Sequence, residues 1–162
     1  AWFAQKVEMV DNADAEMAAM NQFNPLMVAV VDKRFAADLE GFTPQPDSTA
    51  TIALTDYKPN VVTYQSNTKT EQLAIFSEIY YQPGWKAFVD GKETPHFRAD
   101  WTLRGLRVPA GEHQIVFRFE PDNYIMATQV ASVSSLLILL LLAGAIAWSV
   151  RNTLKKDKEL QK

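Results

Sequence analysis

The sequence contains no cysteine. The chain can therefore form no disulfide bond, and it offers neither a thiolate nucleophile nor a thiolate ligand for a metal ion. Its 162 residues leave room for one ordinary domain with one appendage, and 48% hydrophobic with 22% charged residues is close to a globular average. One sizeable hydrophobic core is expected.

Charge is missing altogether from residues 123–150, which include no Asp, Glu, Lys or Arg. The run LLILLLLAGAIAW within them has none of the polar positions that a buried helix of a soluble protein keeps along one face. Tyr124 and Trp148 lie about 36 Å apart along a helix, which matches a hydrocarbon core with its two interfaces. We therefore predict a transmembrane helix at residues 123–150.

The charges on either side of this helix predict its orientation. Residues 151–162 form a basic tail, with Arg151, Lys155, Lys156, Lys158 and Lys162 against Asp157 and Glu159. By the positive-inside rule the tail is cytoplasmic, and residues 1–122 form an extracytoplasmic domain. Acidic residues outnumber basic ones in that domain, which argues against nucleic acid as a partner.

The first residues, AWFAQKVEMV, lack an initiator Met, a basic stretch, an apolar run and a small-residue cleavage site. An outer domain with a cytoplasmic C-terminus must be carried across the membrane by something upstream. We therefore expect the C-terminal part of a longer, multi-spanning protein, in contact with the lipid bilayer and with upstream transmembrane helices of the same chain. A cleaved signal peptide is the alternative.

The N-terminal part of the domain is expected to mix a helix with strands. Residues 2–9 and 27–32 predict two strands. Between them, Asp11 or Asn12 can cap a short helix whose first turn is acidic. The stretch 33–48 has two prolines near its end, which predicts a loop or a hairpin.

From Ser48 onward the pattern is all-β. Short runs rich in β-branched and aromatic residues alternate with turn signals every eight to twelve residues, and no helix-length pattern lies between them. This spacing favours an antiparallel β-sandwich, immunoglobulin-like or jelly-roll-like, over a parallel sheet.

Three joints of this region support specific predictions. Asp90-Gly91 suits a type I′ turn and thus a β-hairpin. Pro109-Ala110-Gly111 is expected to close the strand before it onto the strand after it. Gly105 interrupts the alternation of its strand, because Leu103 and Leu106 would otherwise fall on opposite faces, and a β-bulge there would reconcile them.

Catalytic and metal-binding signatures are hard to find. His96 and His113 are the two imidazoles, with no third metal ligand and no nucleophile beside them, so we interpret both as surface or structural residues. The acidic residues that stand out, Asp90 and Asp100 among them, are explained by turns and joints. We predict no catalytic residue, no metal and no cofactor.

Aromatic residues offer the best candidate for binding. Flat rings at a sheet edge can stack on sugars, and arginines can meet hydroxyl or phosphate groups. The alternative is that Trp85 and Trp101 belong to the sandwich core, since alternation buries one face of each strand. The proposed ligand-binding residues are Tyr80, Tyr81, Trp85, Trp101 and Arg104, with Arg98 and Arg107 nearby.

Several of these motifs, taken in order, resemble a known family. The series Tyr81–Lys86, Val89–Lys92, Val108–Gly111 and Phe117–Pro121, followed at once by a Leu-rich helix, resembles the C-terminus of YfhO-like bacterial membrane proteins. The N-terminal stretches VEMVDNADAEMAAMNQFNP and VAVVDKRF are also similar to the sequence that precedes this domain in the family.

The resemblance implies a large polytopic protein of the bacterial cytoplasmic (inner) membrane, with the domain on the periplasmic side. It also implies a GT-C-like membrane core, which transfers sugars from a polyprenyl-phosphate carrier to cell-envelope polymers. In such proteins the acidic catalytic residue lies in an early extracytoplasmic loop, so none can be carried over to these residues. We therefore expect a C-terminal accessory domain with the final membrane span, in contact with a cell-envelope glycan. The alternative is a single-pass, membrane-anchored carbohydrate-binding or adhesion module without enzymatic activity.

Overall fold

The computed structural model describes residues 1–160, apart from the side chains of residues 122, 123, 125, 150 and 152–160. The lysines of the predicted tail beyond Arg151 lie outside the described side chains. The chain divides after Glu120 into two compact units, which are taken separately below. The elements are β1 (Trp2–Ala4), β2 (Lys6–Val10), α1 (Ala13–Met20), β3 (Val28–Asp32), a 3₁₀ helix η1 (Lys33–Leu39), β4 (Thr51–Lys58), β5 (Val61–Thr68), β6 (Gln72–Ile79), β7 (Trp85–Val89), β8 (Lys92–Thr94), β9 (Phe97–Ala99), β10 (Leu103–Val108), β11 (Gly111–Phe119) and α2 (Asp122–Leu160).

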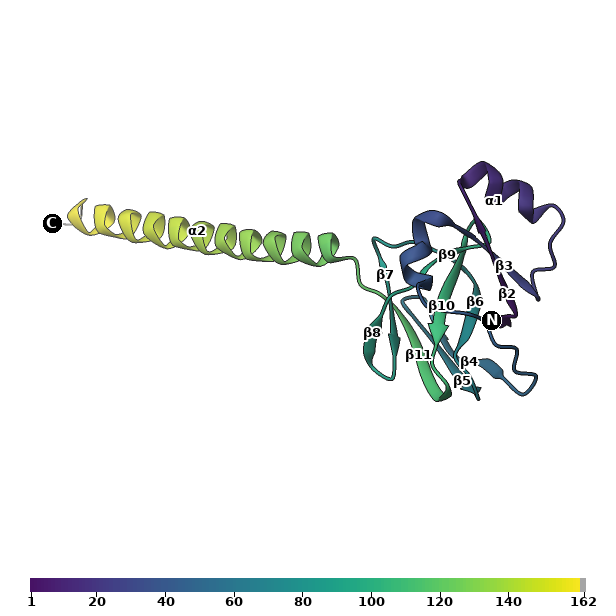
Figure 1. Cartoon of the computed structure of the whole chain (residues 1–162). Helices are drawn as coiled ribbons and strands as arrows, with labels where there is room; N and C mark the ends of the chain where they lie inside the picture. Colours follow the sequence, from purple (N-terminus) through teal and green to yellow (C-terminus); the bar gives the residue numbers. More distant parts are fainter. Residues whose placement is uncertain (161–162) are drawn as a thin grey trace. The chain divides into compact units, whose positions relative to one another are not determined.

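Two antiparallel sheets form most of the first unit, which confirms the predicted sandwich (Figure 1). One sheet has the strand order β1-β6-β10-β9 and the other β4-β5-β11-β7-β8. Alternate residues of both sheets face a shared core, in which Phe76 packs edge to face with Tyr64 and Phe117, at 4.8 Å between ring centroids in each case. The buried members of this core are Val62, Tyr64, Ala74, Phe76, Ala87, Val89, Leu106, Val108, Ile115 and Phe117.

The predicted hairpin at Asp90-Gly91 is present. Strands β7 and β8 pair across it, with Val89 opposite Lys92. The φ angles of Asp90 and Gly91 are 50° and 80°, so both central residues have the positive φ that a type I′ turn requires.

The joint at Pro109–Gly111 is not a hairpin, and that prediction was wrong. Strand β10 before the joint pairs with β6 and β9, whereas β11 after it pairs with β5 and β7 in the other sheet. The turn therefore carries the chain from one layer of the sandwich to the other. A tight turn in the sequence marks a reversal of direction, but it does not determine whether the two strands share a sheet.

The four-stranded sheet is buried on both faces. On β10, Leu106 and Val108 face the core between the sheets, whereas Leu103 packs into a second cluster on the opposite face. The predicted bulge at Gly105 is therefore wrong: alternation continues through Gly105, and the register shifts at Leu103/Arg104, where β6 carries the extra residues. Gly105 instead makes room for the Phe97 ring, which lies 2.7 Å from the place a Cβ would occupy.

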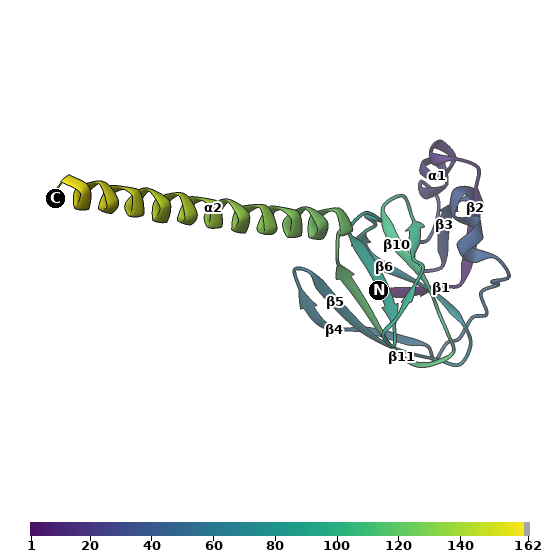
Figure 2. The same ribbon diagram turned by 90° about the vertical axis from the view of Figure 1, so that its left-hand side faces the viewer.

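The second cluster is covered by the N-terminal segment. Strands β2 and β3 pair in parallel and are linked through α1, so this part is a β-α-β unit rather than a continuation of the antiparallel sandwich. The expected first strand is divided at Gln5, because β1 joins the four-stranded sheet and β2 pairs with β3. Asn12 caps α1 as predicted, since its side chain accepts a hydrogen bond from the Ala15 N–H at 3.0 Å. Figures 1 and 2 both show α1, β2 and β3 grouped beside the sandwich.

The second unit is the helix α2. Its segment Met126–Ser149 has a mean hydropathy of 2.5 and is long and apolar enough to cross a membrane, and none of it is buried against the rest of the protein. The apolar C-terminal helix expected from the sequence is thus present.

Candidate functional site

A pocket of about 720 Å³ opens in the first unit beside the loop that joins β6 to β7. Two further segments complete its wall: the 3₁₀ helix η1 on one side and the residues between β8 and β9 on the other. It is called the β6–β7 pocket below. Its lining residues are Arg34, Phe35, Asp38, Tyr80, Gln82, Trp85, Lys86, Ala87, Glu93, Thr94, Pro95 and His96.

Aromatic rings form the apolar part of this pocket. The Tyr80 ring stands edge to face with the rings of Phe35 and His96, at centroid distances of 5.8 Å and 5.3 Å. Trp85 is half-buried: it lines the pocket and also packs against the sandwich core. Rings held in this way present stable flat surfaces, and such surfaces suit stacking on a sugar ring.

The Trp85 ring rests on a buried guanidinium. Arg104 is 3% exposed, and its Cζ lies 4.1 Å from the Trp85 centroid and 5.0 Å from that of Phe117. Its Nε donates a hydrogen bond of 3.0 Å to the carbonyl of Ile79, and its Nη1 lies 2.9 Å from Glu78 Oε2. The pair is charge-matched, which is the condition for keeping a guanidinium inside a core.

Tyr64 completes this buried network. Its hydroxyl donates a hydrogen bond of 2.8 Å to Glu78 Oε1. Burial, followed by the hydrogen bond to Glu78, raises the pKa of Tyr64, so the phenol stays protonated and remains a donor. Burial also lowers the pKa of Arg104, against the opposing effect of Glu78. Arg104 thus supports the Trp85 ring from behind, because it does not itself line the pocket.

Charged groups from η1 and β8 line the polar part of the pocket. Arg34 Nη2 lies 2.7 Å from Asp32 Oδ2 and keeps about half of its side-chain surface exposed. Burial raises the pKa of Asp38. With Glu93 these groups present both donors and acceptors, which is the combination needed to bind hydroxyl groups.

His96 lies in the wall of the pocket as a neutral ring. Burial, with a smaller contribution from the nearby Arg104 charge, lowers the pKa of His96 to about 4. Its Nε2 is buried and makes no hydrogen bond. His113 is structural: its Nδ1 lies 2.6 Å from Asp90 Oδ2, and this hydrogen bond raises the pKa of His113.

Only part of the predicted ligand-binding set meets at this pocket. Tyr80 and Trp85 line it, and Arg104 lies behind Trp85. Tyr81 points elsewhere, since its ring stacks on Phe119 at 6.5 Å and 23°. Trp101 is also separate, and Arg98 lies 5.5 Å from the Trp101 ring.

Trp101 belongs to a buried polar joint between α1, β3 and β9. Glu16 is fully buried, and its two oxygens accept hydrogen bonds from Arg98 Nη2 at 2.6 Å and from the Trp101 N–H at 2.9 Å. Asp100 Oδ1 accepts from the Val30 N–H at 2.8 Å, whereas its Oδ2 is buried without a partner. Burial raises the pKa of Asp100 to about 6. This joint attaches the β-α-β unit to the sandwich.

The residues of η1 and His96 line the pocket, but no sequence pattern predicted that they would. Arg34, Phe35 and Asp38 fall in the stretch that we predicted to be a loop or hairpin. Their position depends on tertiary packing, because Phe35 inserts into the cluster on the outer face of the four-stranded sheet. No local sequence signal indicates such a contact. Among the described residues, no group of three or more His, Asp or Glu is arranged to hold a metal ion.

An antiparallel β-sandwich followed by one apolar helix of membrane-spanning length defines a membrane protein with a folded domain outside the bilayer. The model of the family described as bacterial membrane protein YfhO matches residues 39–131. This stretch is more than half of the chain, and the chain belongs to the YfhO family. No curated protein matches the chain, and no solved structure matches it.

The family match contains most of the β6–β7 pocket but not all of it. Tyr80, Trp85 and Arg104 lie within residues 39–131, as do the first residues of the apolar helix. Arg34, Phe35 and Asp38 lie before the match. The side of the pocket that η1 forms is thus a feature of this chain beyond the matched region.

Proposed function

We propose that this chain is the C-terminal accessory domain and final membrane span of a polytopic protein related to GT-C glycosyltransferases. In this proposal the parent protein transfers sugars from a polyprenyl-phosphate carrier to cell-envelope polymers. The sandwich holds a segment of the acceptor glycan in the β6–β7 pocket. In this proposal catalysis belongs to the membrane core of the parent protein.

The observation that carries this proposal is the aromatic surface of the pocket with charged groups around it. Sugar recognition needs a flat apolar surface for the C–H face of the ring and fixed polar groups for its hydroxyls. Trp85 and Tyr80 supply the surface, and Arg34, Asp38 and Glu93 supply the polar groups. The volume of about 720 Å³ lies within the range of small-molecule sites.

The domain acts on the extracytoplasmic side in this proposal. The acidic domain precedes the apolar segment and basic residues follow it, which is the charge distribution of a helix whose C-terminus is cytoplasmic. Strand β11 ends at Phe119 and α2 begins at Asp122, so the connection is too short for the sandwich to move far from the membrane surface.

Binding measurements on the full chain in detergent or nanodiscs test the pocket. Oligosaccharides of bacterial envelope polymers, presented on an array and then titrated in solution, should bind the native chain. Trp85→Ala should weaken binding by about tenfold or more, which corresponds to the ~1.4 kcal/mol or more expected for a lost stacking surface. The matched control is Trp101→Ala, which removes a ring of the same kind away from the pocket.

The parent enzyme provides the second half of the test. Full-length protein with Trp85→Ala should transfer sugar more slowly, with the Michaelis constant for the acceptor raised. Unchanged binding and transfer in a folded Trp85→Ala variant would remove the glycan-holding role. Glycan binding without any transfer by the full-length protein, together with a single membrane span, would favour the alternative of a membrane-anchored carbohydrate-binding module.

A further inference from the structure

A group of exposed apolar side chains surrounds the point where the chain leaves the sandwich. Tyr57, Ile79, Tyr81 and Phe119 are 68%, 71%, 52% and 36% exposed. They are half of the large apolar side chains that are exposed in residues 1–120. We call these four residues the exit patch, because β11 ends at Phe119 and the next two residues lead into α2.

The four residues belong to segments that meet around the buried Arg104 and the half-buried Trp85. The Phe119 ring lies 5.4 Å from Trp85 and stacks on Tyr81. The carbonyl of Ile79 accepts the Arg104 Nε hydrogen bond. Tyr57 of β4 lies opposite Val62 of β5, which in turn pairs with Phe117 of β11. The four residues therefore lie at the same end of the sandwich, although they come from three different parts of the chain.

Backbone hydrogen bonds fix this end of the sandwich. The Glu120 N–H donates to the carbonyl of Gly84 at 2.6 Å, and the Phe119 N–H donates to the carbonyl of Asn60 at 2.9 Å. The Phe119 ring fills the space beside Gly84, where a Cβ would lie 2.1 Å from the ring. The β4–β5 turn and the β6–β7 loop are thus both attached to the last residues of β11. The backbone beneath the exit patch is therefore fixed.

The covalent connection limits how far the exit patch can be from lipid. The apolar segment of α2 begins at Met126. From Phe119 to Met126 the chain can span at most about 17 Å, from three extended steps of ~3.5 Å and four helical steps of ~1.5 Å. A headgroup region lies between the hydrocarbon and water on each side of a bilayer, so this length brings Phe119 to that region or close to it.

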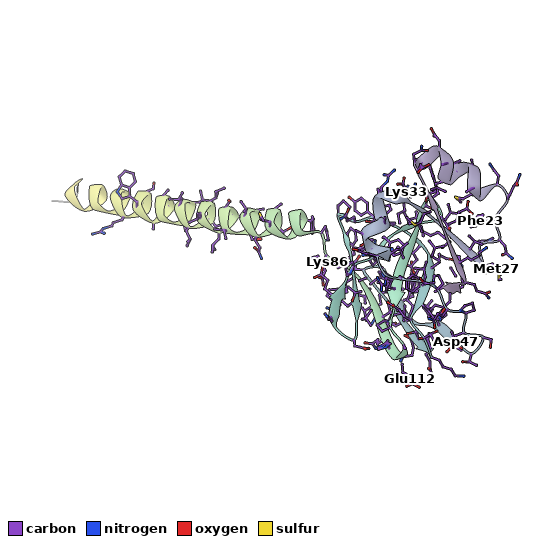
Figure 3. The ribbon with its side chains drawn as sticks, in the orientation of Figure 1. Phe23, Met27, Lys33, Asp47, Lys86 and Glu112 are labelled. Atoms are coloured by element: carbon purple, nitrogen blue, oxygen red, sulfur yellow. The ribbon has the colours of Figure 1, made fainter. Side chains whose placement is uncertain are left out.

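The composition of this end of the domain matches a lipid interface. Tyrosine and phenylalanine are favoured at the level of the headgroups, where an apolar ring meets a wet, polar layer. Lys58 and Arg118 lie at the same level as each other, since both pair with Val61, and cations at this depth meet lipid phosphates. Lys86 pairs with Arg118 and thus marks this end of β11. Glu112 lies near the other end of the strand, and Figure 3 shows the two residues well separated.

We propose that the exit patch is a lipid-binding surface: Tyr57, Ile79, Tyr81 and Phe119 enter the headgroup region of the leaflet in which α2 begins. The occupant is the bilayer itself. Because the loop that follows Ile79 also carries Tyr80 and Trp85 into the β6–β7 pocket, this contact would hold the pocket at the level of the headgroups. Lipid contact does not depend on glycan binding.

Site-specific labelling of the full chain tests the proposal, because the absence of cysteine makes every introduced thiol unique. Ile79→Cys and Tyr81→Cys, each labelled with an environment-sensitive fluorophore, are reconstituted in nanodiscs that contain one copy of the chain. Glu112→Cys, exposed at the far end of β11, is the matched control. Quenching by lipids brominated near the headgroup, and by aqueous iodide, is measured for each site.

We expect brominated lipid to quench the Ile79 and Tyr81 labels at least about twofold more strongly than the Glu112 label, and iodide to do the reverse. Equal lipid quenching at all three sites would overturn the proposal. Labels shielded from iodide but not quenched by lipid would also overturn it, since protein would then cover the exit patch. Glycan titrations on the same samples measure binding in the β6–β7 pocket independently. A failure of the lipid-contact proposal can therefore be distinguished from a failure of the glycan-binding proposal.

Discussion

The guanidinium of Arg104 lies 4.1 Å from the centroid of the Trp85 ring and is buried beneath it. One face of Trp85 is therefore occupied by a cation, and its position depends on an ion pair with Glu78 rather than on apolar packing alone. A ring supported in this way keeps its orientation when no ligand is present. Preorganisation of this kind lowers the entropic cost of binding.

Arg104→Met tests this support. The variant keeps the volume roughly constant but leaves Glu78, which also accepts the Tyr64 hydrogen bond, without its cationic partner. We expect the free energy of unfolding to fall by about 3–5 kcal/mol, as for other broken buried pairs, and glycan binding to weaken as Trp85 loses its support. Denaturant unfolding followed by tryptophan fluorescence measures the first effect.

The double variant Arg104→Met/Glu78→Gln is the control for that experiment. It removes both charges, so it should recover part of the lost stability without restoring the support of Trp85. Stability and glycan binding would then separate. If the double variant bound glycan as well as the native chain, Arg104 would have only a structural role.

Asp100 makes the stability of the domain depend on pH. Burial raises its pKa in the folded state from 3.8 to about 6. A raised pKa means that the protonated carboxyl favours folding. This contribution is fully present below pH 3.8 and is lost as the pH rises through about 6, by about 3 kcal/mol at most for a shift of two units.

Asp100→Asn should remove this loss and raise the free energy of unfolding at pH 7. Asparagine keeps the acceptor for the Val30 N–H and tolerates the positive φ of 47° at this position. Asp100→Ala is the matched comparison, because it removes the carboxyl without keeping the hydrogen bond. Unfolding curves between pH 4 and pH 7 measure the effect, and an Asn variant less stable than the native chain at pH 7 would contradict it.

His96 has the opposite dependence in an overlapping range. Burial lowers its folded-state pKa from 6.5 to about 4, so its neutral form favours folding. That contribution is present above pH 6.5 and is lost as the pH falls toward 4. His96→Gln should therefore make the domain lose less stability on acidification than the native chain does, as measured by the same unfolding curves. Equal losses in the two proteins would contradict the assignment of a buried, neutral ring.

Gly84→Ala should disturb the exit of β11. The new Cβ would lie 2.1 Å from the Phe119 ring, so the ring must move. We expect a loss of about 1–3 kcal/mol in the free energy of unfolding, and a higher exposure of Tyr81, which stacks on Phe119. Pro83→Ala, an exposed position in the same loop, is the control and should stay closer to the native stability. Thermal unfolding and chemical modification of tyrosine provide the two measurements.

The proposed orientation can be tested in intact cells that express the parent protein. A Cys introduced at Glu112 should react with a membrane-impermeant reagent from outside, whereas a tag after Lys162 should be accessible only after the membrane is opened. The reverse pattern would place the sandwich in the cytoplasm. Glycan binding at the cell surface would then be excluded.

The sequence was sufficient to predict the features that depend on local chemistry. The Asp90-Gly91 turn, the Asn12 cap and the apolar helix each depend on residues close together in the chain, and all three are present. The error at Gly105 had a different origin. A strand buried on both faces shows apolar residues at odd and even positions alike, and only the presence of a third layer, the β-α-β unit, explains this pattern.

The sequence also predicted only part of the candidate site. Tyr80 and Trp85 were found because they flank one turn. Trp101 looked equivalent in the sequence, yet the backbone at Asp100 and Trp101 has positive φ angles of 47° and 69°, and the Trp101 N–H binds Glu16 of a distant helix. Contacts between segments more than 80 residues apart, such as this one, leave no periodic signal.

The short strand β1 sets a practical limit on how this domain can be cut. Trp2, Phe3 and Ala4 pair with Ile75, Ala74 and Leu73 of β6, and thus form an edge of the four-stranded sheet. A fragment trimmed to residues 39–131 would lose this strand, and the backbone of β6 would be left unpaired. The side chains beside that edge belong to the two hydrophobic clusters, so the edge could pair with the strand of another molecule. Such a fragment should aggregate on expression, whereas a fragment that starts at Ala1 keeps β1 paired with β6 and should remain soluble.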